Sequence, residues 1–261
     1  MHQLEYILKI SNLSKNFGGL SAVKNCSLKI KRGSITGIIG PNGSGKTTLF
    51  NIIAGLLKPS SGKVFFNNEN ITGIPSYDLF SKGILRTFQI AQEFSNLTVL
   101  ENLMVVPANQ SGENLINALF ARKKFKNEED QIRQKAYEVT DFLNLKKLAN
   151  ELAGNLSGGQ KKLLELGRTM MVDSKLVLLD EVGAGVNRTL LKDLGTAILR
   201  LNKEKGYTFC MIEHDMDFIS RMCDPVIVLS DGKVLFEGTS DEVKNNDQVI
   251  ESYLGRSNKK S

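Results

Sequence analysis

The sequence predicts an α/β fold with a mostly parallel sheet, an N-terminal antiparallel β subdomain and a helical insertion. Three observations support this prediction. Residues 1–35 alternate apolar and polar residues as short strands do, residues 96–172 show helical spacing, and the chain from residue 176 alternates buried strands with helices. Strands that alternate with helices are typical of a parallel sheet.

The first 70 residues contain strand and turn patterns around one helix. Residues 35–39 form a short apolar run that enters glycines, as a buried strand does. We expect a hairpin turn before this run at Arg32-Gly33, and a helix after it that covers residues 47–57 and stops near Pro59. A second hairpin is expected to turn at Asn67-Asn68.

The middle of the chain is helical. Thr98 and Glu101 form a capping box before an apolar run. One face of an amphipathic helix is then marked by Ile132, Ala136, Val139 and Leu143. After this insertion we expect buried strands at residues 176–179, 208–212 and 225–230, with a helix before the second of them that Gly206 ends.

The composition is that of an ordinary globular protein. The chain has 261 residues, of which 41% are hydrophobic and 24% charged, which excludes disordered and collagen-like classes. No apolar run reaches the ~18 residues of a membrane-spanning helix, and we expect no signal peptide. The three cysteines, Cys26, Cys210 and Cys223, are too far apart for a metal-ligand pair and indicate reduced thiols.

The net charge of +6 suggests phosphate-bearing partners or an anionic surface. The basic clusters are small, at residues 122–124 and at Lys259-Lys260. We interpret them as a solvated helix face and a chain end, and expect no nucleic-acid partner.

A glycine-rich loop between the strand at 35–39 and the following helix fits the phosphate-binding pattern G-x-x-x-x-G-K-[ST]. Its backbone N–H groups can converge on an anion at a helix N-terminus. We expect Lys46 to reach the β- and γ-phosphates and Thr47 to bind Mg²⁺. The chain is therefore expected to have a P-loop NTPase core, with nucleotide contacts from Gly40, Pro41, Asn42, Gly43, Ser44, Gly45, Lys46, Thr47 and Thr48.

Asp180 and Glu181 follow a buried strand, where an acidic residue is costly unless it is paired. Asp180 is either a plain helix cap or a ligand in the Mg²⁺ shell, while Glu181 can orient or deprotonate the attacking water. His214 also follows a buried strand. Because ligands bind at the carboxyl ends of parallel strands, we expect Gly40, Asp180 and His214 to line one edge, where His214 can contact a γ-phosphate.

A second glycine-rich turn precedes a helix at Leu156. Its residues are Ser157, Gly158, Gly159 and Gln160. Taken alone, these four residues are equally consistent with an N-cap followed by a glycine turn and with a second anion-binding site. One nucleotide could hardly use both turns of a compact monomer, so a partner subunit could supply the second.

Together these motifs resemble the ATP-binding subunits of ABC transporters, and the resemblance covers nearly the whole chain. Residues 40–47 match the Walker A loop, residues 156–160 the LSGGQ signature, residues 176–181 Walker B with its catalytic glutamate, and His214 the switch histidine. Gln89 falls at the Q-loop, which implies a catalytic and Mg²⁺-binding role. Phe17 falls where an aromatic residue stacks on adenine.

The resemblance is closest to the branch that serves branched-chain amino acid uptake and its relatives, including urea uptake. The strings at residues 17–20, 86–89, 184–187 and 249–255 look like that branch. Two departures are Val182 and Arg188, which stand where the branch commonly has prolines on either side of the D-loop. Neither change removes a phosphate or metal ligand.

The resemblance implies one ABC ATPase domain over residues 1–261, with residues 1–88 and 173–261 as nucleotide-binding core and β subdomain. Residues 89–172 would be the helical subdomain. It further implies that two such subunits, identical or related, close head to tail on two ATP molecules. Integral-membrane permease subunits at the cytoplasmic face would respond through the segment after Gln89, and hydrolysis by Glu181 and His214 would reopen the pair.

Four alternatives remain open. The chain could power urea or amide uptake or lipopolysaccharide-type export, or act as a soluble, non-transport ABC ATPase. A small-molecule phosphotransferase would explain the phosphate loop, although not the residues 156–160 or His214.

Overall fold

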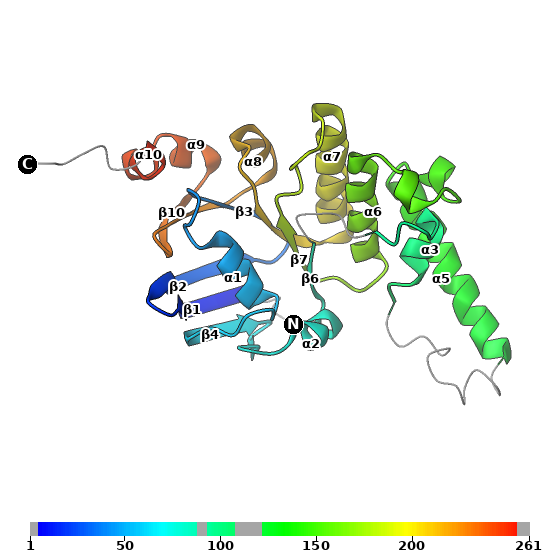
Figure 1. Ribbon diagram of the computed structural model, residues 1–261, viewed down its shortest axis with the longest axis horizontal. Coiled ribbons are helices and arrows are strands. Elements are labelled where there is room, and N and C mark those ends of the chain that lie inside the picture. Colours follow the sequence, from blue (N-terminus) through cyan, green and yellow to red (C-terminus); the bar gives the residue numbers. More distant parts are fainter. Residues whose placement is uncertain (1–4, 88–92, 108–121, 255–261) are drawn as a thin grey trace, which may run out of the picture. The chain divides into compact units, whose positions relative to one another are not determined.

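The computed structural model describes residues 5–87, 93–107 and 122–254 of the chain (Figure 1). Gln89 and the terminal Lys259 and Lys260 lie outside these ranges, as do the side chains of residues 122–126. The chain divides into two compact units. We call Met1–Arg86, Lys175–Ala184 and Ile198–Ser261 the sheet unit, and Thr87–Ser174 with Gly185–Ala197 the helical unit.

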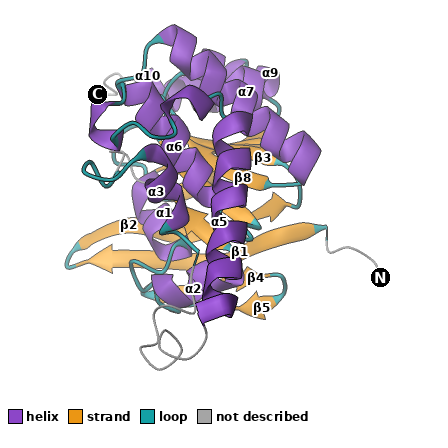
Figure 2. Ribbon diagram, turned by 90° about the vertical axis from the view of Figure 1, so that its right-hand side faces the viewer, coloured by secondary structure: helices purple, strands orange, loops and turns teal. Residues whose placement is uncertain are grey.

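The sheet unit contains two sheets. An antiparallel sheet has the strand order β2-β1-β4-β5, and a six-stranded sheet has the order β10-β9-β3-β8-β7-β6. The first comprises β1 (Tyr6–Phe17), β2 (Leu20–Lys31), β4 (Ser61–Phe66) and β5 (Glu69–Asn70), whose strands are drawn in orange in Figure 2. The second comprises β3 (Ile35–Ile39), β6 (Ile84–Arg86), β7 (Leu176–Asp180), β8 (Thr208–Ile212), β9 (Val226–Ser230) and β10 (Lys233–Gly238).

The six-stranded sheet is parallel except at one edge, where β10 pairs antiparallel with β9. Every residue of β3, β7 and β8 is buried. Such continuously apolar strands are typical of a parallel sheet covered on both faces. The predicted mostly parallel sheet and the predicted antiparallel region are therefore both confirmed.

Five helices of the sheet unit lie in its described part: α1 (Lys46–Ile53), α2 (Ser76–Lys82), α8 (Met216–Met222), α9 (Ser240–Lys244) and α10 (Asp247–Leu254). Leu49 and Phe50 of α1 are fully buried in one hydrophobic cluster with residues of both sheets, such as Leu8 and Ile212. Full burial of such a side chain contributes about 1.5–3 kcal/mol. The cluster therefore fixes α1, and the loop before it, against both sheets.

The described helical unit contains α3 (Val99–Met104), α5 (Arg122–Phe142), the short 3₁₀ turns η2 (Lys146–Leu148) and η3 (Ala153–Asn155), and α6 (Gly158–Met170). Helix α7 (Arg188–Lys205) begins in this unit and ends in the sheet unit. The predicted capping box at the start of α3 is confirmed, because Thr98 Oγ1 accepts from Glu101 N and the Glu101 carboxylate accepts from Thr98 N. Three residues of the predicted stripe, Ala136, Val139 and Leu143, are buried.

Some local predictions hold and others are wrong. Asn67 and Asn68 connect β4 and β5 as a two-residue hairpin turn, and both have positive φ, as that turn requires. The hairpin expected at Arg32-Gly33 is wrong, because β2 and β3 belong to different sheets. The segment 1–35 also forms two long strands and the start of a third rather than several short ones.

The helix expected over residues 47–57 ends earlier, at Ile53. Gly55 then takes φ +72°, and a Cβ atom at this position would lie 2.4 Å from the Ile74 carbonyl oxygen. The close approach of these two backbone segments turns the chain away before the helical pattern ends. In the described part of the chain, no helix is both long and apolar enough to cross a bilayer.

Candidate nucleotide-binding site

The glycine-rich loop joins β3 to α1 in the sheet unit and packs closely against its neighbours. Gly40 has φ +149° and Gly45 φ +97°. A Cβ atom at Gly40 would lie 2.0 Å from the Leu229 carbonyl oxygen, and one at Gly45 would lie 2.4 Å from the Ala22 carbonyl oxygen. Only glycine fits at these two positions, which explains why the pattern requires it.

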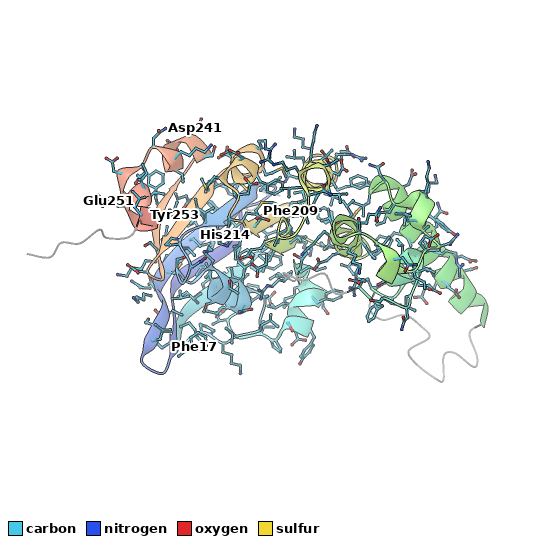
Figure 3. The ribbon with its side chains drawn as sticks, turned by 45° about the horizontal axis from the view of Figure 1, so that its top comes forward. Phe17, Phe209, His214, Asp241, Glu251 and Tyr253 are labelled. Carbon is cyan, nitrogen blue, oxygen red and sulfur yellow. The ribbon has the colours of Figure 1, made fainter. Side chains whose placement is uncertain are left out.

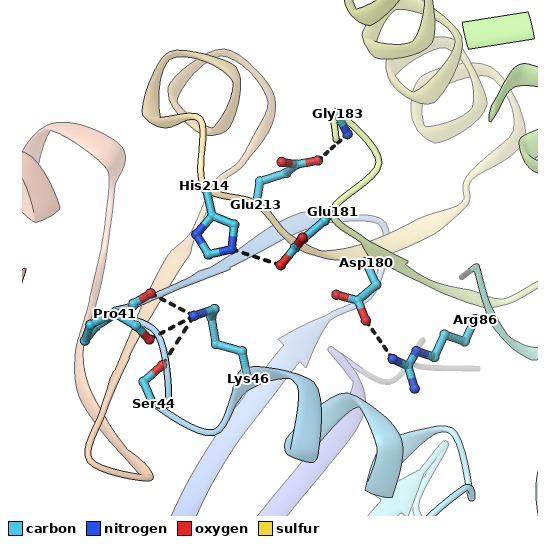
Figure 4. Close-up of polar contacts among 10 residues, drawn as sticks. Pro41, Ser44, Lys46, Arg86, Asp180, Glu181, Gly183, Glu213 and His214 are labelled. Carbon is cyan, nitrogen blue, oxygen red and sulfur yellow. Dashed lines mark hydrogen bonds and ion pairs between the residues drawn. The ribbon is translucent and has the colours of Figure 1, made fainter. Parts of the chain in front are cut away.

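Lys46 is the first residue of α1, and its amine points back into the loop (Figure 4). Nζ donates to the carbonyl oxygens of Gly40, at 2.8 Å, and Pro41, at 3.1 Å. Burial lowers the pKa of Lys46, while the nearby Glu181 and Asp180 act in the opposite direction. A buried cation held by neutral acceptors gains from a phosphate, because the attraction between opposite charges is then added to the hydrogen bonds.

The N-terminus of α1 is also suited to an anion. Gly45 is the N-cap residue of α1, and in the described part of the chain no side-chain hydrogen bond caps this end of the helix. First-turn N–H groups without a cap form an anion site together with the helix dipole. Thr47 is exposed in this first turn and Thr48 is half-buried, while Ser44 is buried within the loop. Asn42 and Gly43 are exposed at its tip.

Asp180 is the last residue of β7 and is buried. Its carboxylate forms an ion pair with Arg86 of the adjacent strand β6, with Nη2 and Oδ2 2.6 Å apart. The other terminal nitrogen of Arg86 donates to Asn51 of α1. The pairing supplies the partner that a buried acid requires.

Glu181 and His214 meet at the carboxyl ends of β7 and β8. His214 Nε2 and Glu181 Oε1 are 2.9 Å apart, and the two side chains are 49% and 21% exposed. They therefore form a solvent-accessible hydrogen-bonded pair. Because β3, β8 and β7 are adjacent parallel strands, Gly40, Asp180 and His214 line one edge of the sheet, as predicted.

The residues present fit Mg²⁺ when a phosphate accompanies the ion. No group of three His, Cys, Asp or Glu side chains that could hold a metal occurs within residues 5–87, 93–107 and 122–254. Mg²⁺ is usually bound through one or two protein oxygens together with substrate phosphates and water. The Thr47 hydroxyl and the Asp180 carboxylate are hard oxygen donors of this kind, at the end of the sheet where the phosphate loop lies.

The second glycine-rich turn belongs to the helical unit. Ser157 caps α6: its Oγ accepts from Gln160 N at 3.4 Å, and Gln160 Oε1 accepts from Ser157 N at 2.9 Å. Ser157 and Gly158 are exposed, while Gly159 is buried. A Cβ atom at Gly159 would lie 2.4 Å from Leu190 Cδ1. The N-cap interpretation of this turn is thus confirmed, and Gly159 has a packing role as well.

Phe17 lies at the end of β1, where the hairpin turns through Gly18 and Gly19 into β2 (Figure 3). The residue is 46% exposed, and Lys15 Nζ lies 5.1 Å from the ring centroid. An exposed aromatic ring can offer one face to a base. Gln89 lies outside the described residues.

The D-loop region accommodates both unexpected residues. Val182 is buried, at 4% exposure. Arg188 is the first residue of α7, where Asn187 Oδ1 accepts from Leu190 N. The first helical position tolerates proline because its N–H has no intrahelical partner. Arginine there therefore changes no hydrogen bond of the helix.

Two residues of the site were not assigned a role from the sequence. Arg86 was noted only within the segment 86–89, which resembles one branch of the family. A basic residue in a short apolar strand nevertheless indicates a buried acidic partner. Glu213 follows β8 and is buried, and its Oε1 accepts from Gly183 N at 2.8 Å. Nothing in its sequence context distinguishes it from a surface glutamate before a loop.

Comparisons with known proteins agree with this geometry. The family model described as "ABC transporter" matches residues 23–184, and one described as "Branched-chain amino acid ATP-binding cassette transporter" matches residues 233–257. The chain is 42% identical over 249 residues to a probable branched-chain amino acid transport ATP-binding protein LivG of Archaeoglobus fulgidus, covering 95% of each chain. It is 36% identical to the high-affinity branched-chain amino acid transport ATP-binding protein BraF of Pseudomonas aeruginosa, covering 95% and 98%.

Solved structures of ATP-binding cassettes are similar in fold. A nucleotide-free cassette from an ABC transporter aligns with a TM-score of 0.82 and 40% identity, covering 96% of this chain and 99% of that one. A cassette in its ADP conformation aligns with a TM-score of 0.83 and 39% identity, covering 97% and 100%.

Proposed function

Since the chain belongs to the ATP-binding subunits of ABC transporters, we propose that it hydrolyses ATP to power the import of branched-chain amino acids. One observation carries the enzymatic part of this proposal. The Lys46 amine, the Asp180 carboxylate and the Glu181–His214 pair gather at the carboxyl ends of adjacent parallel strands. The match of residues 233–257 to the branched-chain amino acid model, together with the named relatives, supports the choice of cargo.

In this proposal the loop from Gly40 to Thr48 binds the phosphates. The first-turn N–H groups of α1 and the Lys46 amine face the β- and γ-phosphates, and this contact replaces the bonds from Lys46 to the loop carbonyls. Thr47, Asp180 and Gln89 would hold Mg²⁺, which supplies charge neutralisation on the phosphate oxygens. Phe17 would stack on the adenine ring.

Glu181 is proposed to orient the attacking water and to accept its proton. Water attacks the γ-phosphorus, the bond to the β–γ bridging oxygen breaks, and ADP leaves with the electron pair of that bond. His214 holds Oε1 of Glu181 and lies where it can contact a γ-phosphate oxygen. The contact between these two residues sets the direction in which the carboxylate points.

The signature residues of the helical unit would act in a pair of subunits. Ser157, Gly158, Gly159 and Gln160 of one cassette would cover the nucleotide held by the other, and the second cassette is either identical or related. Ser157 and Gly158 are exposed at the N-terminal end of α6, which supports such a contact. Integral-membrane permease subunits would receive the change through the segment after Gln89, with the chain held at the cytoplasmic face by these partners.

Substitution of the water-orienting carboxylate tests the proposal. We expect Glu181→Gln to bind ATP normally and to hydrolyse it at least about a hundredfold more slowly, because the amide cannot accept the proton. Glu204→Gln is the matched control, since Glu204 is an exposed carboxylate paired only with Arg200 as far as the described residues show. ATP binding and phosphate release are measured with the copurified permease subunits. Near-wild-type turnover of Glu181→Gln would remove Glu181 from its role.

The cargo is tested separately. Cells that lack this chain are expected to lose uptake of labelled leucine, isoleucine and valine, and to regain it when the wild-type chain is expressed but not when Glu181→Gln is. Labelled urea is the comparison cargo. Restored urea uptake without restored leucine uptake would leave the ATPase proposal intact and overturn the choice of cargo.

A further inference from the structure

Glu181 stands in a backbone conformation that a glutamate rarely adopts. Its φ is +48°, in the left-handed region, which costs a residue with a side chain about 1–2 kcal/mol. Two backbone hydrogen bonds surround it: Glu181 N donates to Ile212 O at 2.9 Å, and Ala184 N donates to Glu181 O at 3.0 Å. The second bond closes a tight turn over residues 181–184. A strained turn of this kind persists only where its surroundings hold it.

Glu213 holds this turn from the neighbouring strand end. Its side chain is buried, at 5% exposure, and Oε1 accepts from Gly183 N at 2.8 Å (Figure 4). The backbone N–H of His214, the next residue in the chain, lies close to the same carboxyl group. One buried carboxyl group therefore connects the turn that carries Glu181 to the backbone of His214, and these two residues are hydrogen-bonded to each other through their side chains.

The carboxyl group is costly to keep at this position. Burial raises the pKa of Glu213, and the nearby Glu181 carboxylate acts in the same direction. The backbone N–H groups of Gly183 and His214 act in the opposite direction. A buried acid beside a second acid indicates that its acceptor oxygens serve the site.

We propose that Glu213 is a positioning residue for ATP hydrolysis: it holds the 181–184 turn and the backbone of His214 so that the carboxylate of Glu181 faces the attacking water. This inference rests on the proposed role of Glu181. Glu213 itself contacts neither the phosphate loop nor Lys46 through any hydrogen bond of the described residues. Its contribution is therefore expected in the chemical step and not in nucleotide binding.

Three substitutions separate the properties of this side chain. Glu213→Gln keeps the length and an acceptor oxygen, so we expect kcat within about threefold of wild type. Glu213→Asp keeps the charge but is one methylene too short to reach Gly183 N, and Glu213→Ala removes the acceptor altogether. For both we expect kcat to fall about tenfold or more, because misplacement of a catalytic group by about 1 Å has effects of this size. KM and the affinity for ATP stay within about threefold.

Thr208→Val is the matched control for loss of a buried hydrogen bond. Thr208 is the first residue of the same strand, is 1% exposed, and its Oγ1 accepts from Gly33 N at 2.9 Å. This variant loses the same type of bond at the far end of β8. We expect it to lower the melting temperature while kcat per folded molecule stays that of wild type. If Glu213→Ala does not fold, the inference is tested by comparing kcat of Glu213→Asp with kcat of Glu213→Gln.

The outcomes are distinguishable. Wild-type kcat in both Glu213→Asp and Glu213→Ala overturns this inference. A change in KM without a change in kcat also overturns it, as does an equal fall of kcat in Thr208→Val. A slow Glu213→Gln beside a normal Glu213→Asp also overturns it, since charge and not the hydrogen bond would then matter. Glu181→Gln is assayed in parallel. A fully active Glu181→Gln overturns the proposed function together with this inference, whereas an inactive one beside an active Glu213→Ala overturns this inference alone.

Discussion

Asp180 ends the buried strand β7 with a charged group, and Arg86 on β6 balances it. The two side chains are 6% and 11% exposed, so little water reaches either charge. A buried pair of this kind contributes little net stability relative to apolar residues, but removing one partner leaves the other charge without compensation. Asp180 would otherwise depend on a bound cation for its charge balance.

We therefore predict that Arg86→Met lowers the free energy of unfolding by about 3–5 kcal/mol, because Asp180 stays buried without its partner. The double variant Arg86→Met/Asp180→Asn is expected to regain part of this loss. Urea denaturation followed by circular dichroism measures both. Lys82→Met is the control: its pair with Glu69 is exposed, and we expect a loss of at most about 1 kcal/mol. If Arg86→Met and Lys82→Met lowered the free energy of unfolding equally, Asp180 would not depend on Arg86 for its charge balance.

At the scale of elements, the sequence predicts strands and turns where one local cause decides the structure. The Asn67-Asn68 turn follows from two residues that tolerate positive φ, and the start of α3 follows from the Thr98–Glu101 box. The expected hairpin at Arg32-Gly33 fails because the choice of sheet depends on distant partners: β2 pairs with β1, and β3 pairs with β8 and β9. No local pattern contains that information.

The same distinction applies to the site. The positions of the site residues at one end of the sheet could be predicted because each residue follows or ends a buried strand. These residues are the loop 40–47, Asp180, Glu181 and His214. Arg86 and Glu213 could not be assigned roles, since their partners, Asp180 and Gly183, are 94 and 30 residues away in the sequence. A residue whose role is to hold another residue becomes visible only when the strand order is known.

The C-terminal helix α10 lies near the phosphate loop, with the phenol of Tyr253 close to the backbone N–H of Gly40. Tyr253 is 48% exposed. Its partial burial raises its pKa, and the Gly40 N–H acts in the opposite direction. Figure 3 labels Tyr253 on this helix, which lies within the segment that matches the branched-chain amino acid model. Tyr253 therefore places a helix of the segment that matches the branched-chain amino acid model beside Gly40, the first glycine of the phosphate loop.

Removing this hydroxyl is predicted to destabilise the helix contact. Tyr253→Phe removes the phenol oxygen beside Gly40 N, and we expect the free energy of unfolding to fall by about 0.5–1 kcal/mol, the loss typical of one neutral hydrogen bond. Tyr77→Phe is the control, because Tyr77 is 71% exposed on α2. Urea denaturation of both variants measures the difference. A loss no greater than that of Tyr77→Phe would contradict the contact.

At the scale of the whole molecule, the two units divide the predicted site. The phosphate loop, Asp180, Glu181, Glu213 and His214 belong to the sheet unit, and the residues 157–160 belong to the helical unit. The chain passes between the units at residues 86/87, 174/175, 184/185 and 197/198. One of these passages, at Ala184, directly follows the turn that carries Glu181. The boundary between the units therefore lies next to the turn of Glu181, the residue proposed to orient the attacking water.

The cysteines offer a probe of one unit alone, because Cys26, Cys210 and Cys223 all lie in the sheet unit and all are buried. Burial raises the pKa of Cys26 to about 11 and raises the pKa of Cys210 and Cys223 as well. At pH 8 only about one Cys26 side chain in a thousand is then a thiolate, the form that reacts. Labelling by a thiol reagent therefore requires the sheet unit to open.

We predict that the native protein reacts slowly with such a reagent, and that ATP with Mg²⁺ slows labelling further. A ligand that binds only the closed form lowers the open population by the factor 1 + [L]/Kd, which is about a hundredfold at a hundred times Kd. Mass spectrometry of each alkylated cysteine measures the rates. Lys46→Ala is the matched variant, because it loses the amine proposed to contact the phosphates while its three cysteines are unchanged. Its labelling is expected to respond far less to ATP. Rapid labelling of any of the three thiols in the native protein would contradict their burial. Equal protection by ATP in Lys46→Ala would contradict nucleotide binding through Lys46.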